Sequence, residues 1–334
     1  MRHVIPRTGA GLLVTLLVVT GTALAAPSPV VAPAGAAPPF RSAAGITVLS
    51  VADHGRVQNV RISTPAVSTA ALSTRDFHDV SILLPTGYDP GVRYPVLYLH
   101  HGRGGGNGDW LINTDVEELT AGLPLIVVMP QGGRAGWGAD WVNQAFGAQR
   151  WDTFHLDQLI GWVDANLSTI PDRTGRAVAG FSMGGVTAIR SAALRPHLFS
   201  FAAGFSGGYD LEDVRMRGVV TGSLFLEGLP PDGPFGAPWD PAWSASNPWH
   251  RAAAFRDVHT VLYAGRSWSD PAAGTLERES HAMSYQFWQR IRAAGATRSW
   301  FLEYADPTCG HHYGCAREAL ARELGPMMDV LAGP

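Results

Sequence analysis

The residues best placed to do chemistry surround Ser182. An apolar run at 176–181 is typical of a buried strand, and it leads directly into the Gly-x-Ser-x-Gly motif of residues 180–184. Between a strand and a helix, this motif makes a tight turn that pushes the serine hydroxyl outwards. Glycine is needed at both ends of the motif, because a side chain there would collide across the turn. We therefore predict that Ser182 is a nucleophile that attacks ester carbonyls.

A serine nucleophile needs a histidine base, and an acid must orient that base. Proteins with this turn carry the three groups in the order serine, acid, histidine along the chain. The last histidines, His311 and His312, follow an expected strand at 299–304. Neighbouring residues in a loop point in different directions, so only one of the two can face Ser182. No further ligands stand at the spacing of a metal site, so we do not interpret the pair as metal ligands.

The acid is expected after the strand at 258–264. Asp270, Glu277 and Glu279 all lie in that part of the chain. Position alone favours Asp270, which is nearest to the end of the strand. An acid at the start of a helix can instead serve only the helix dipole, so position does not settle the choice.

The tetrahedral intermediate of ester cleavage needs backbone N–H donors, each worth roughly 10²–10³ in rate. Met183 directly follows the nucleophile and supplies one of them. The second is expected from the loop after the strand at 96–101, where residues 101–106 are rich in glycine. This loop has neither the Gly-x-Gly-x-x-Gly pattern nor a Walker lysine, so a phosphate-binding loop is not favoured.

The elements that must position these residues follow from the hydrophobic pattern. Short apolar runs rich in β-branched residues predict strands at 46–51, 57–63, 77–85, 96–101, 125–130, 176–181, 199–205, 258–264 and 299–304. Helices are expected at 151–167, 182–194, 275–294 and 317–331. Strands that alternate with helices indicate an α/β fold, with a mostly parallel central sheet and helices on both faces. Ligands bind at the carboxyl edge of such sheets, where Ser182 is expected.

Residues 207–249 interrupt the alternation of strands and helices. This segment is rich in Gly and Pro and contains Trp239, Trp243 and Trp249. We interpret it as an insertion over the carboxyl edge of the sheet. Its tryptophans either form an apolar wall for the substrate or simply pack the long segment against the domain, and packing is the favoured interpretation.

The first 25 residues have the layout of a cleavable secretory signal. Two arginines precede an apolar stretch over 10–19, and Ala23-Leu24-Ala25 fits a cleavage site. The apolar stretch is shorter than the ~20 residues that a spanning helix needs. We therefore expect a secreted, extracellular protein, in which residues 26–43, rich in Ala and Pro, form a flexible linker to a catalytic domain over 44–334.

The chain has two cysteines, Cys309 and Cys315. In an oxidising compartment, two thiols so close in sequence can form a disulfide, and we predict that bond. Loop entropy makes so short a ring worth roughly 2 kcal/mol, so its main effect is expected on local rigidity.

Composition limits the partners of the protein. The chain has 334 residues, 46% of them hydrophobic, which is enough for one large core, and its net charge is −3. This charge provides no basic field for nucleic acid. We expect a small-molecule ester or lipid as substrate, and the oligomeric state stays open.

Further motifs are distributed along residues 46–331. They are Tyr94-Pro95-Val96-Leu97-Tyr98-Leu99, Trp110 with Ile112-Asn113-Thr114, Trp151-Asp152-Thr153-Phe154, Gly161-Trp162, Ala165-Asn166, Gly180 to Gly184, Phe199, Ser206-Gly207, Asp240-Pro241-Ala242-Trp243 and Asn247-Pro248. In this order they resemble the putative-esterase branch of the α/β-hydrolase superfamily, with its antigen 85 mycolyltransferases and esterase D-like serine esterases. The resemblance implies an α/β-hydrolase fold and ester chemistry through an acyl-enzyme, with no cofactor and no metal.

The resemblance also selects among the candidates for acid and base. The family's acid is a Glu in a Leu-Glu pair ten residues before a helical Phe, a spacing that Glu277 and Phe287 match. Glu277 is therefore preferred over Asp270. The family's base stands two residues before a glycine, which selects His312 ahead of His311.

The family's second oxyanion donor corresponds to Arg103. The mycolyltransferases carry an Asp-Gly-Leu-Arg run around trehalose, whereas this chain has His101-Gly102-Arg103-Gly104 and lacks the acidic and basic side chains at those positions. Trehalose is therefore not expected as an acceptor. The expected site residues are the catalytic Ser182, Glu277 and His312, with Met183 and Arg103 in the oxyanion hole.

The expected function is a secreted serine hydrolase or acyltransferase that acts on carboxylic esters. A strict acyl transferase of the mycolyl type, with a sugar or glycerol acceptor, is the alternative within enzymology, since the two differ only in what attacks the acyl-enzyme. The third function is a non-catalytic exported binding protein, because the mycobacterial relatives also bind a host matrix protein.

Overall fold

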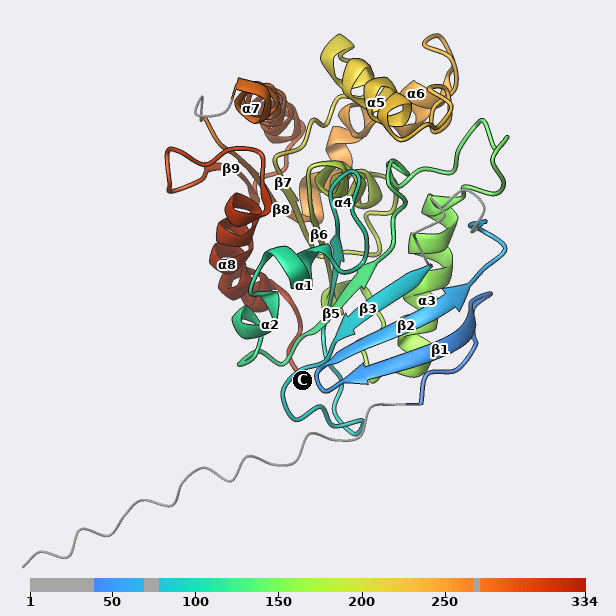
Figure 1. Cartoon of the computed structure of the whole chain (residues 1–334). Helices are drawn as coiled ribbons and strands as arrows, with labels where there is room; N and C mark the ends of the chain where they lie inside the picture. The colour runs from blue at the N-terminus through green and yellow to red at the C-terminus, as the bar shows by residue number, and fades with distance from the viewer. Residues whose placement is uncertain (1–38, 69–77, 267–270) are drawn as a thin grey trace, which may run out of the picture. The chain divides into compact units, whose positions relative to one another are not determined.

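The computed structural model describes residues 39–68, 78–266 and 271–334. The expected signal peptide, most of the expected linker and Asp270 lie outside the described residues. Figure 1 shows one twisted central sheet with helices on both sides. In the described part of the chain, the sheet has nine strands in the order β1-β2-β3-β5-β4-β6-β7-β8-β9.

All the strands expected from the sequence are present. They are β1 (Thr47–His54), β2 (Val57–Ser63), β3 (Asp79–Leu83), β4 (Val96–His100), β5 (Ile126–Pro130), β6 (Arg176–Phe181), β7 (Phe201–Phe205), β8 (His259–Ala264) and β9 (Ser299–Glu303). Pairing is antiparallel from β1 through β2 and β3 to β5. It is parallel from β5 through β4, β6, β7 and β8 to β9. The prediction of a mostly parallel α/β sheet is confirmed.

The expected helices are also present, together with several that the sequence analysis missed. The expected ones are η2 (Thr153–Leu159) with α3 (Ile160–Asn166), α4 (Met183–Leu194), α7 (Pro271–Ala293) and α8 (Tyr313–Val330). The missed ones are α1 (Asp109–Asn113), α2 (Val116–Leu119), α5 (Val214–Leu226), α6 (Ala242–Ser246) and the 3₁₀ segments η3 (Arg173–Gly175) and η4 (Pro248–Asp257). Among the described residues, no helix is long and apolar enough to cross a membrane.

Two hydrophobic cores lie on opposite faces of the sheet. Side chains alternate along each strand, so Val96 and Tyr98 of β4 enter one core while Leu97 and Leu99 enter the other. The first core contains residues of η2, α3, α4, η4 and α7, and the second contains residues of α1, α2 and α8. Helices on both faces explain why β3 to β7 are buried along their whole length.

The compact domain includes part of the segment that the sequence analysis assigned to a linker. Phe40 is only 9% exposed, and its ring stacks on Trp162 of α3 with the ring centroids 5.6 Å apart. The Trp162 indole N–H also donates to the carbonyl of Arg41, at 2.9 Å. Residues from Phe40 onwards are therefore packed against the domain.

Candidate active site

Ser182 lies in a strained turn between β6 and α4. Its backbone has φ 55° and ψ −119°, a conformation that residues other than glycine seldom adopt. A Cβ atom at Gly180 would lie 2.4 Å from the backbone of Gly184, and a Cβ at Gly184 would lie 2.4 Å from the carbonyl oxygen of His100. The two glycines are thus required for the close approach of α4 to β4 and β6.

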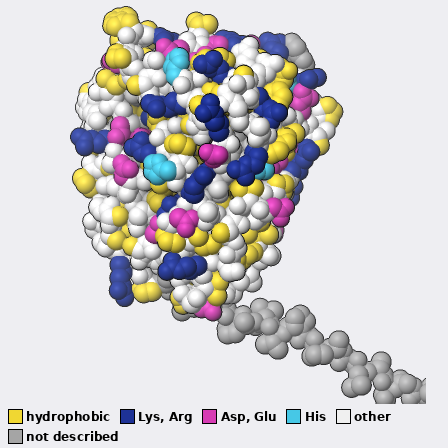
Figure 2. Space-filling view, turned by 180° about the vertical axis from the view of Figure 1, so that it is seen from behind, with side chains coloured by type: hydrophobic (Ala, Val, Ile, Leu, Met, Phe, Trp, Pro, Cys, Tyr) yellow, Lys and Arg dark blue, Asp and Glu magenta, His cyan; other side chains and the backbone are white. Residues whose placement is uncertain are grey.

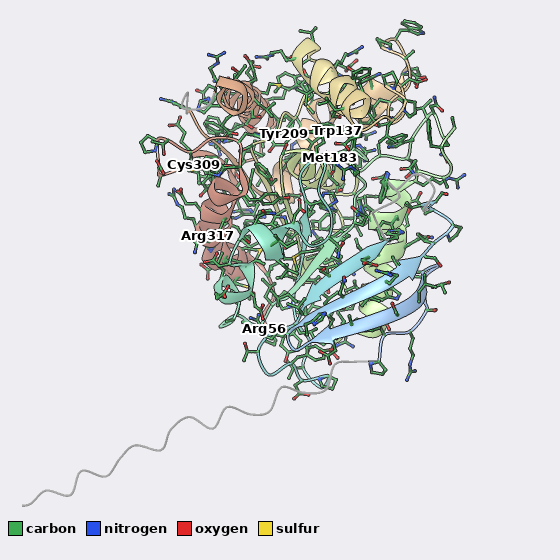
Figure 3. The ribbon with its side chains drawn as sticks, viewed as in Figure 1. Arg56, Trp137, Met183, Tyr209, Cys309 and Arg317 are labelled. Carbon is green, nitrogen blue, oxygen red and sulfur yellow. A yellow bond between two sulfur atoms is a disulfide. The ribbon has the colours of Figure 1, made fainter. Side chains whose placement is uncertain are left out.

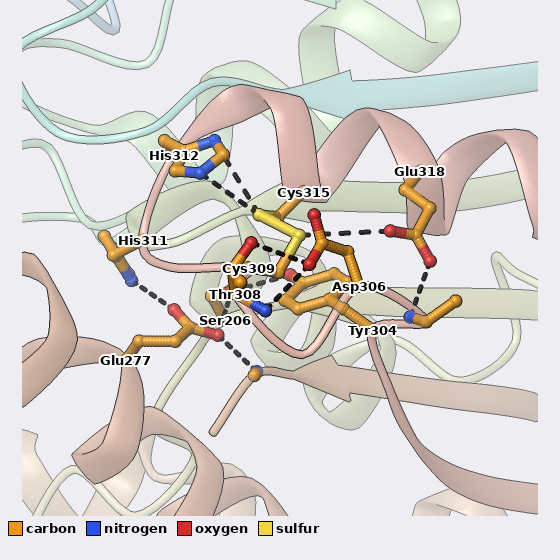
Figure 4. Close-up of a disulfide and its surroundings, with 12 residues drawn as sticks. Ser206, Glu277, Tyr304, Asp306, Thr308, Cys309, His311, His312, Cys315 and Glu318 are labelled. Atoms are coloured by element: carbon orange, nitrogen blue, oxygen red, sulfur yellow. Dashed lines mark hydrogen bonds and ion pairs between the residues drawn. A yellow bond between two sulfur atoms is a disulfide. The ribbon is translucent and has the colours of Figure 1, made fainter. Parts of the chain in front are cut away.

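His311 connects Ser182 to Glu277. The imidazole Nε2 is 2.8 Å from Ser182 Oγ, and Nδ1 is 2.8 Å from Glu277 Oε2. The His311 side chain is 10% exposed, and that of Glu277 is fully buried. Figure 4 shows the pair of His311 and Glu277 beside the disulfide loop. In this arrangement the ring can accept a proton from the serine hydroxyl while the carboxylate holds its other N–H group.

The structure places His311, rather than the preferred His312, beside Ser182. His312 is exposed and precedes α8, and its ring lies 3.3 Å from the sulfur of Cys315. Tyr313 turns back towards the site, with its ring 4.9 Å from that of Phe181. Residues 311 and 313 therefore face the sheet edge, and residue 312 between them faces outwards. The prediction from the spacing between the histidine and a following glycine did not take into account that neighbouring side chains of this loop face opposite directions.

Glu277 is fixed by hydrogen bonds on its second oxygen. Oε1 accepts from Ser206 Oγ at 2.8 Å and from the Gly265 N–H at 2.6 Å. The Tyr304 hydroxyl lies 2.7 Å from Ser206 Oγ and donates to it, because the serine proton is already directed at Glu277. These bonds stabilise a buried carboxylate and leave Oε2 for His311.

Ser206 and Tyr304 were not identified from the sequence as site residues. Ser206 has φ 55°, and its N–H donates to the carbonyl of Tyr263 in the neighbouring strand β8, at 2.7 Å. Ser182 repeats this pattern one strand away, with its N–H bound to the carbonyl of Phe205 at 2.8 Å. A serine directly after a buried parallel strand was the available signal for Ser206.

The other acids considered do not contact His311 in the described structure. Glu279 forms an ion pair with Arg215 at 2.8 Å and lies on α7, two residues after Glu277. Asp270 lies outside the described residues. Of the two acids that the structure describes, Glu277 is the one that contacts the histidine.

The backbone around Ser182 offers two N–H groups for an oxyanion. Met183 is the first residue of α4, so its N–H has no partner within the helix. The N–H of Arg103 is the second donor that we expect. In the Gly102–Arg103 peptide, the carbonyl oxygen of Gly102 lies 2.7 Å from His101 Nδ1 and also accepts from the Gly105 N–H at 3.3 Å. Since N–H and C=O point in opposite directions in a trans peptide, these bonds direct the Arg103 N–H away from His101.

His101 is held in one tautomer by its second nitrogen. Nε2 accepts from the Gly132 N–H at 2.8 Å, so the proton is on Nδ1 and is donated to Gly102. The residue is only 2% exposed. His101 is therefore a positioning residue for the glycine-rich loop, a role that the sequence analysis did not recognise.

Two further contacts tie the glycine-rich loop to its surroundings. The Gly102 N–H donates to the Tyr313 hydroxyl at 2.9 Å, and this hydroxyl donates to Asp109 at 3.0 Å. The Arg103 guanidinium pairs with Glu227 at 2.7 Å. The loop is thereby connected to α8, α1 and the end of α5.

A small, mainly apolar cavity opens beside Ser182. Its lining residues come from α4, α5 and α7 and from the loops that follow β5, β6, β7 and β9: Trp137, Ser182, Met183, Val186, Ser206, Gly207, Gly208, Met216, Val219, Leu276, Ser280, Met283 and His311. Figure 3 shows Trp137, Met183 and Tyr209 together below α5. Trp137 was missed by the sequence analysis; its indole N–H donates to Ser223 of α5 at 3.0 Å.

The insertion contributes to this cavity through other residues than its tryptophans. Trp243 is buried, Trp249 is half-buried and Trp239 is 85% exposed, and none of the three lines the cavity. Met216 and Val219 of α5 form the wall instead. The tryptophan wall is therefore not observed.

The predicted disulfide is confirmed, with Cys309 and Cys315 bonded and their Cα atoms 5.6 Å apart. The ring encloses both His311 and His312, as Figure 4 shows. Among the described residues, no group of three or more His, Cys, Asp and Glu side chains is arranged to hold a metal ion.

A mostly parallel sheet covered on both faces, with a serine at a glycine-flanked strand-to-helix turn, defines an α/β-hydrolase. The family model described as putative esterase matches residues 73–321, and the chain belongs to this family. Family membership supports ester hydrolysis or acyl transfer as the class of chemistry.

Two curated relatives illustrate the range of the family. Esterase Rv1288 of Mycobacterium tuberculosis is 40% identical over 228 residues, which cover 65% of this chain and 49% of the relative. The diacylglycerol acyltransferase/mycolyltransferase Ag85B of Mycobacterium leprae is 31% identical over 232 residues, which cover 64% of this chain and 70% of the relative. The chain thus spans about half the length of the Rv1288 esterase.

Solved structures agree on the fold. Mycobacterium tuberculosis MPT51 (FbpC1) is similar with a TM-score of 0.66 at 24% identity, covering 77% of this chain and 94% of MPT51. An S-formylglutathione hydrolase from Agrobacterium tumefaciens has a TM-score of 0.62 at 14% identity, covering 85% of this chain and 99% of the hydrolase.

Proposed function

We propose that the protein is an exported serine hydrolase or acyltransferase that cleaves carboxylic esters through Ser182, His311 and Glu277. The observation that carries this proposal is the pair of 2.8 Å contacts that His311 makes, one to Ser182 Oγ and one to Glu277 Oε2. A serine whose hydroxyl touches an oriented imidazole is an activated nucleophile.

In the proposed mechanism, Ser182 Oγ attacks the ester carbonyl carbon as its proton moves to His311 Nε2. The carbonyl oxygen becomes an oxyanion, which the N–H groups of Met183 and Arg103 stabilise. His311 then gives the proton to the leaving alcohol, and an acyl-enzyme remains on Ser182. Glu277 holds the imidazole tautomer and stabilises its cation in both directions.

The acyl-enzyme is released when His311 removes a proton from an incoming oxygen nucleophile. Water gives a free acid, whereas a sugar or glycerol hydroxyl gives a new ester. The relatives include both an esterase and a diacylglycerol acyltransferase/mycolyltransferase, so the family supports either outcome. Trehalose is not the expected acceptor, because His101 and Gly104 stand where the mycolyltransferases carry Asp and Arg.

The apolar cavity beside Ser182 supports an acyl group as the part of the substrate that binds there. The cavity is narrow, because lining side chains such as Met183, Val186 and Met283 are almost completely buried. We therefore expect a short or medium acyl chain rather than a long one.

Export is supported by the signal-like pattern of the first 25 residues and by the disulfide between Cys309 and Cys315. Detection of the mature chain outside cells that express the full sequence tests this part of the proposal.

The central experiment combines covalent labelling with an ester series. A fluorophosphonate probe should label the mature protein and not the Ser182→Ala variant, and p-nitrophenyl esters from acetate to palmitate should be hydrolysed with an optimum among the shorter chains. Product analysis with added glycerol separates transfer, which yields a new ester, from hydrolysis. A protein that neither reacts with the probe nor turns over any ester would be a non-catalytic binding protein.

A further inference from the structure

Helix α5 has an unusual outer face. Val214 is 81% exposed, Phe225 is 78% exposed and Leu226 is 70% exposed. Val214 and Phe225 are eleven residues apart, which is close to three full turns, so they lie on one stripe of the helix. The exposed positions between them, Gly218 and Gly222, carry no side chain. The exposed positions of this stripe therefore carry no charge; Arg217, one turn after Val214, is only 28% exposed and donates to the Pro238 carbonyl.

Trp239 is a further exposed apolar side chain, in a segment that is bonded to α5. Its side chain is 85% exposed, and it follows Pro238, whose carbonyl oxygen accepts a hydrogen bond from Arg217 of α5. The Arg217 guanidinium also lies over the ring of Trp243, 5.1 Å from its centroid. These contacts hold the Trp239 segment beside α5. We call Val214, Phe225, Leu226 and Trp239 the apolar docking face.

The inner side of α5 forms part of the active-site cavity. Met216 is 2% exposed, and both Met216 and Val219 line the cavity that opens on Ser182. One helix thus separates the apolar docking face from the place where an acyl group is proposed to bind. Figure 1 shows α5 and α6 at the same end of the molecule, above α4, and Figure 2 shows hydrophobic side chains projecting at that end.

A helix that is apolar on both its buried and its exposed side is unusual at a water-exposed surface. Phe225 and Trp239 are side chains that prefer the boundary between water and lipid, since an aromatic ring is large and apolar and the indole keeps a polar N–H. We propose that the apolar docking face binds the surface of lipid aggregates that contain the ester substrate. This inference rests on the proposed function and states at which surface the protein meets the ester substrate.

The size of the face favours a lipid surface over a second copy of the chain. Its two aromatic residues offer about 150–250 Å² each, whereas a stable dimer buries about 800 Å² on each partner. Insertion into a lipid surface needs no complementary partner and can use a few protruding side chains. Because the four side chains of the face are uncharged, binding should depend little on salt.

The test is co-flotation of the mature protein with phosphatidylcholine vesicles. The wild-type chain and the Ser182→Ala variant should both float, equally well at low and high salt. The double variant Phe225→Ser, Trp239→Ser should lose most of this binding. The matched control, Leu49→Ser, Ile112→Ser, changes two exposed hydrophobic residues elsewhere and should float like the wild type.

Activity gives a second measurement. The Phe225, Trp239 double variant should hydrolyse a soluble p-nitrophenyl ester as the wild type does, and should lose severalfold activity on the same acyl group in an emulsified triacylglycerol. Wild-type protein that fails to float, equal flotation of both double variants, or a dimer that the docking-face variant converts to monomers would overturn the inference. Absence of hydrolysis on every ester, with flotation retained, would instead contradict the proposed function alone.

Discussion

The two ring nitrogens of His311 have different roles. Nε2 must be free of hydrogen to accept the Ser182 proton, and the contact of Nδ1 with Glu277 Oε2 keeps the hydrogen on the other side of the ring. The buried carboxylate is in turn held by Ser206 and Gly265. The position of the imidazole is therefore set by groups from three separate segments of the chain.

The two adjacent histidines provide a matched pair of variants. We expect His311→Ala to lower kcat by at least ~10³, since removal of the base leaves mainly oxyanion stabilisation and binding. His312→Ala should keep activity within about threefold, because this exposed side chain makes no contact with Ser182 or Glu277 among the described residues. Steady-state kinetics on a soluble p-nitrophenyl ester measures both, and a larger loss in the His312 variant would contradict the assignment.

Ser182 could be predicted as the nucleophile from the sequence, because the strained turn requires glycines at fixed positions. The sequence could not predict in the same way which of His311 and His312 faces Ser182. A spacing rule assigns a position to within one residue, whereas the direction of a loop side chain depends on contacts made by its neighbours. Here the Tyr313 ring, packed on Phe181 and Trp110, decides which face of the loop points to the serine.

The glycine-rich loop after β4 depends on one buried imidazole for the direction of its peptide groups. His101 receives a hydrogen bond from Gly132 and donates one to Gly102, and so links the loop after β5 to the loop after β4. The Arg103 N–H belongs to the same peptide as the Gly102 carbonyl, so a rotation of this peptide would remove one of the two proposed oxyanion donors.

We therefore expect His101→Gln to lower kcat by about ten- to a hundredfold with little change in KM, less than the roughly 10²–10³ for outright loss of a donor. Affinity for a boronic acid, which mimics the tetrahedral intermediate, should fall in proportion to kcat. His155→Gln is the control, because His155 is a buried histidine that contacts the Gln131 carbonyl and not the loop at 102–106. A rise in KM without loss of boronate affinity would exclude the positioning role.

At the scale of elements, the strands were the easier part to predict. A strand such as β6, buried on both faces, has a run of apolar residues that can be recognised in the sequence alone. Helix α5 was missed because it is apolar on both sides and lies in a Gly- and Pro-rich segment, so no 3.6-residue period stands out. Helices α1 and α2 have five and four residues, too few to show a period.

Across the whole molecule, buried histidines connect stability to pH. Burial lowers the pKa of His78 from 6.5 to about 3 and that of His155 to about 4, and it places the pKa of His100 well below 6.5. The rings of His100 and His155 lie 4.8 Å apart under the carboxyl edge of β4. The folded protein therefore holds all three rings neutral at pH values where an unfolded chain takes up protons.

Stability should consequently fall as the pH drops below 6.5. Each of these histidines contributes a loss of about 1.4 kcal/mol per pH unit once its unfolded form is protonated, until the pH reaches its folded pKa. Urea unfolding at pH 7.5, 6.0 and 5.0 measures the slope. His155→Gln should reduce that slope by about one proton, since glutamine can still donate to the Gln131 carbonyl. Identical slopes for the two proteins would refute the explanation.

Because Cys309 and Cys315 are bonded, α8 is linked to the sheet twice, by the backbone of residues 309–315 and by the disulfide. A protease that cuts any peptide bond inside this ring, even next to His311, breaks the backbone link and leaves the disulfide intact. The cleaved protein would keep its full mass under non-reducing conditions, and α8 with the C-terminus would separate only after reduction. The segment that carries the base is thus the one exposed loop of this site where a backbone cut does not divide the molecule.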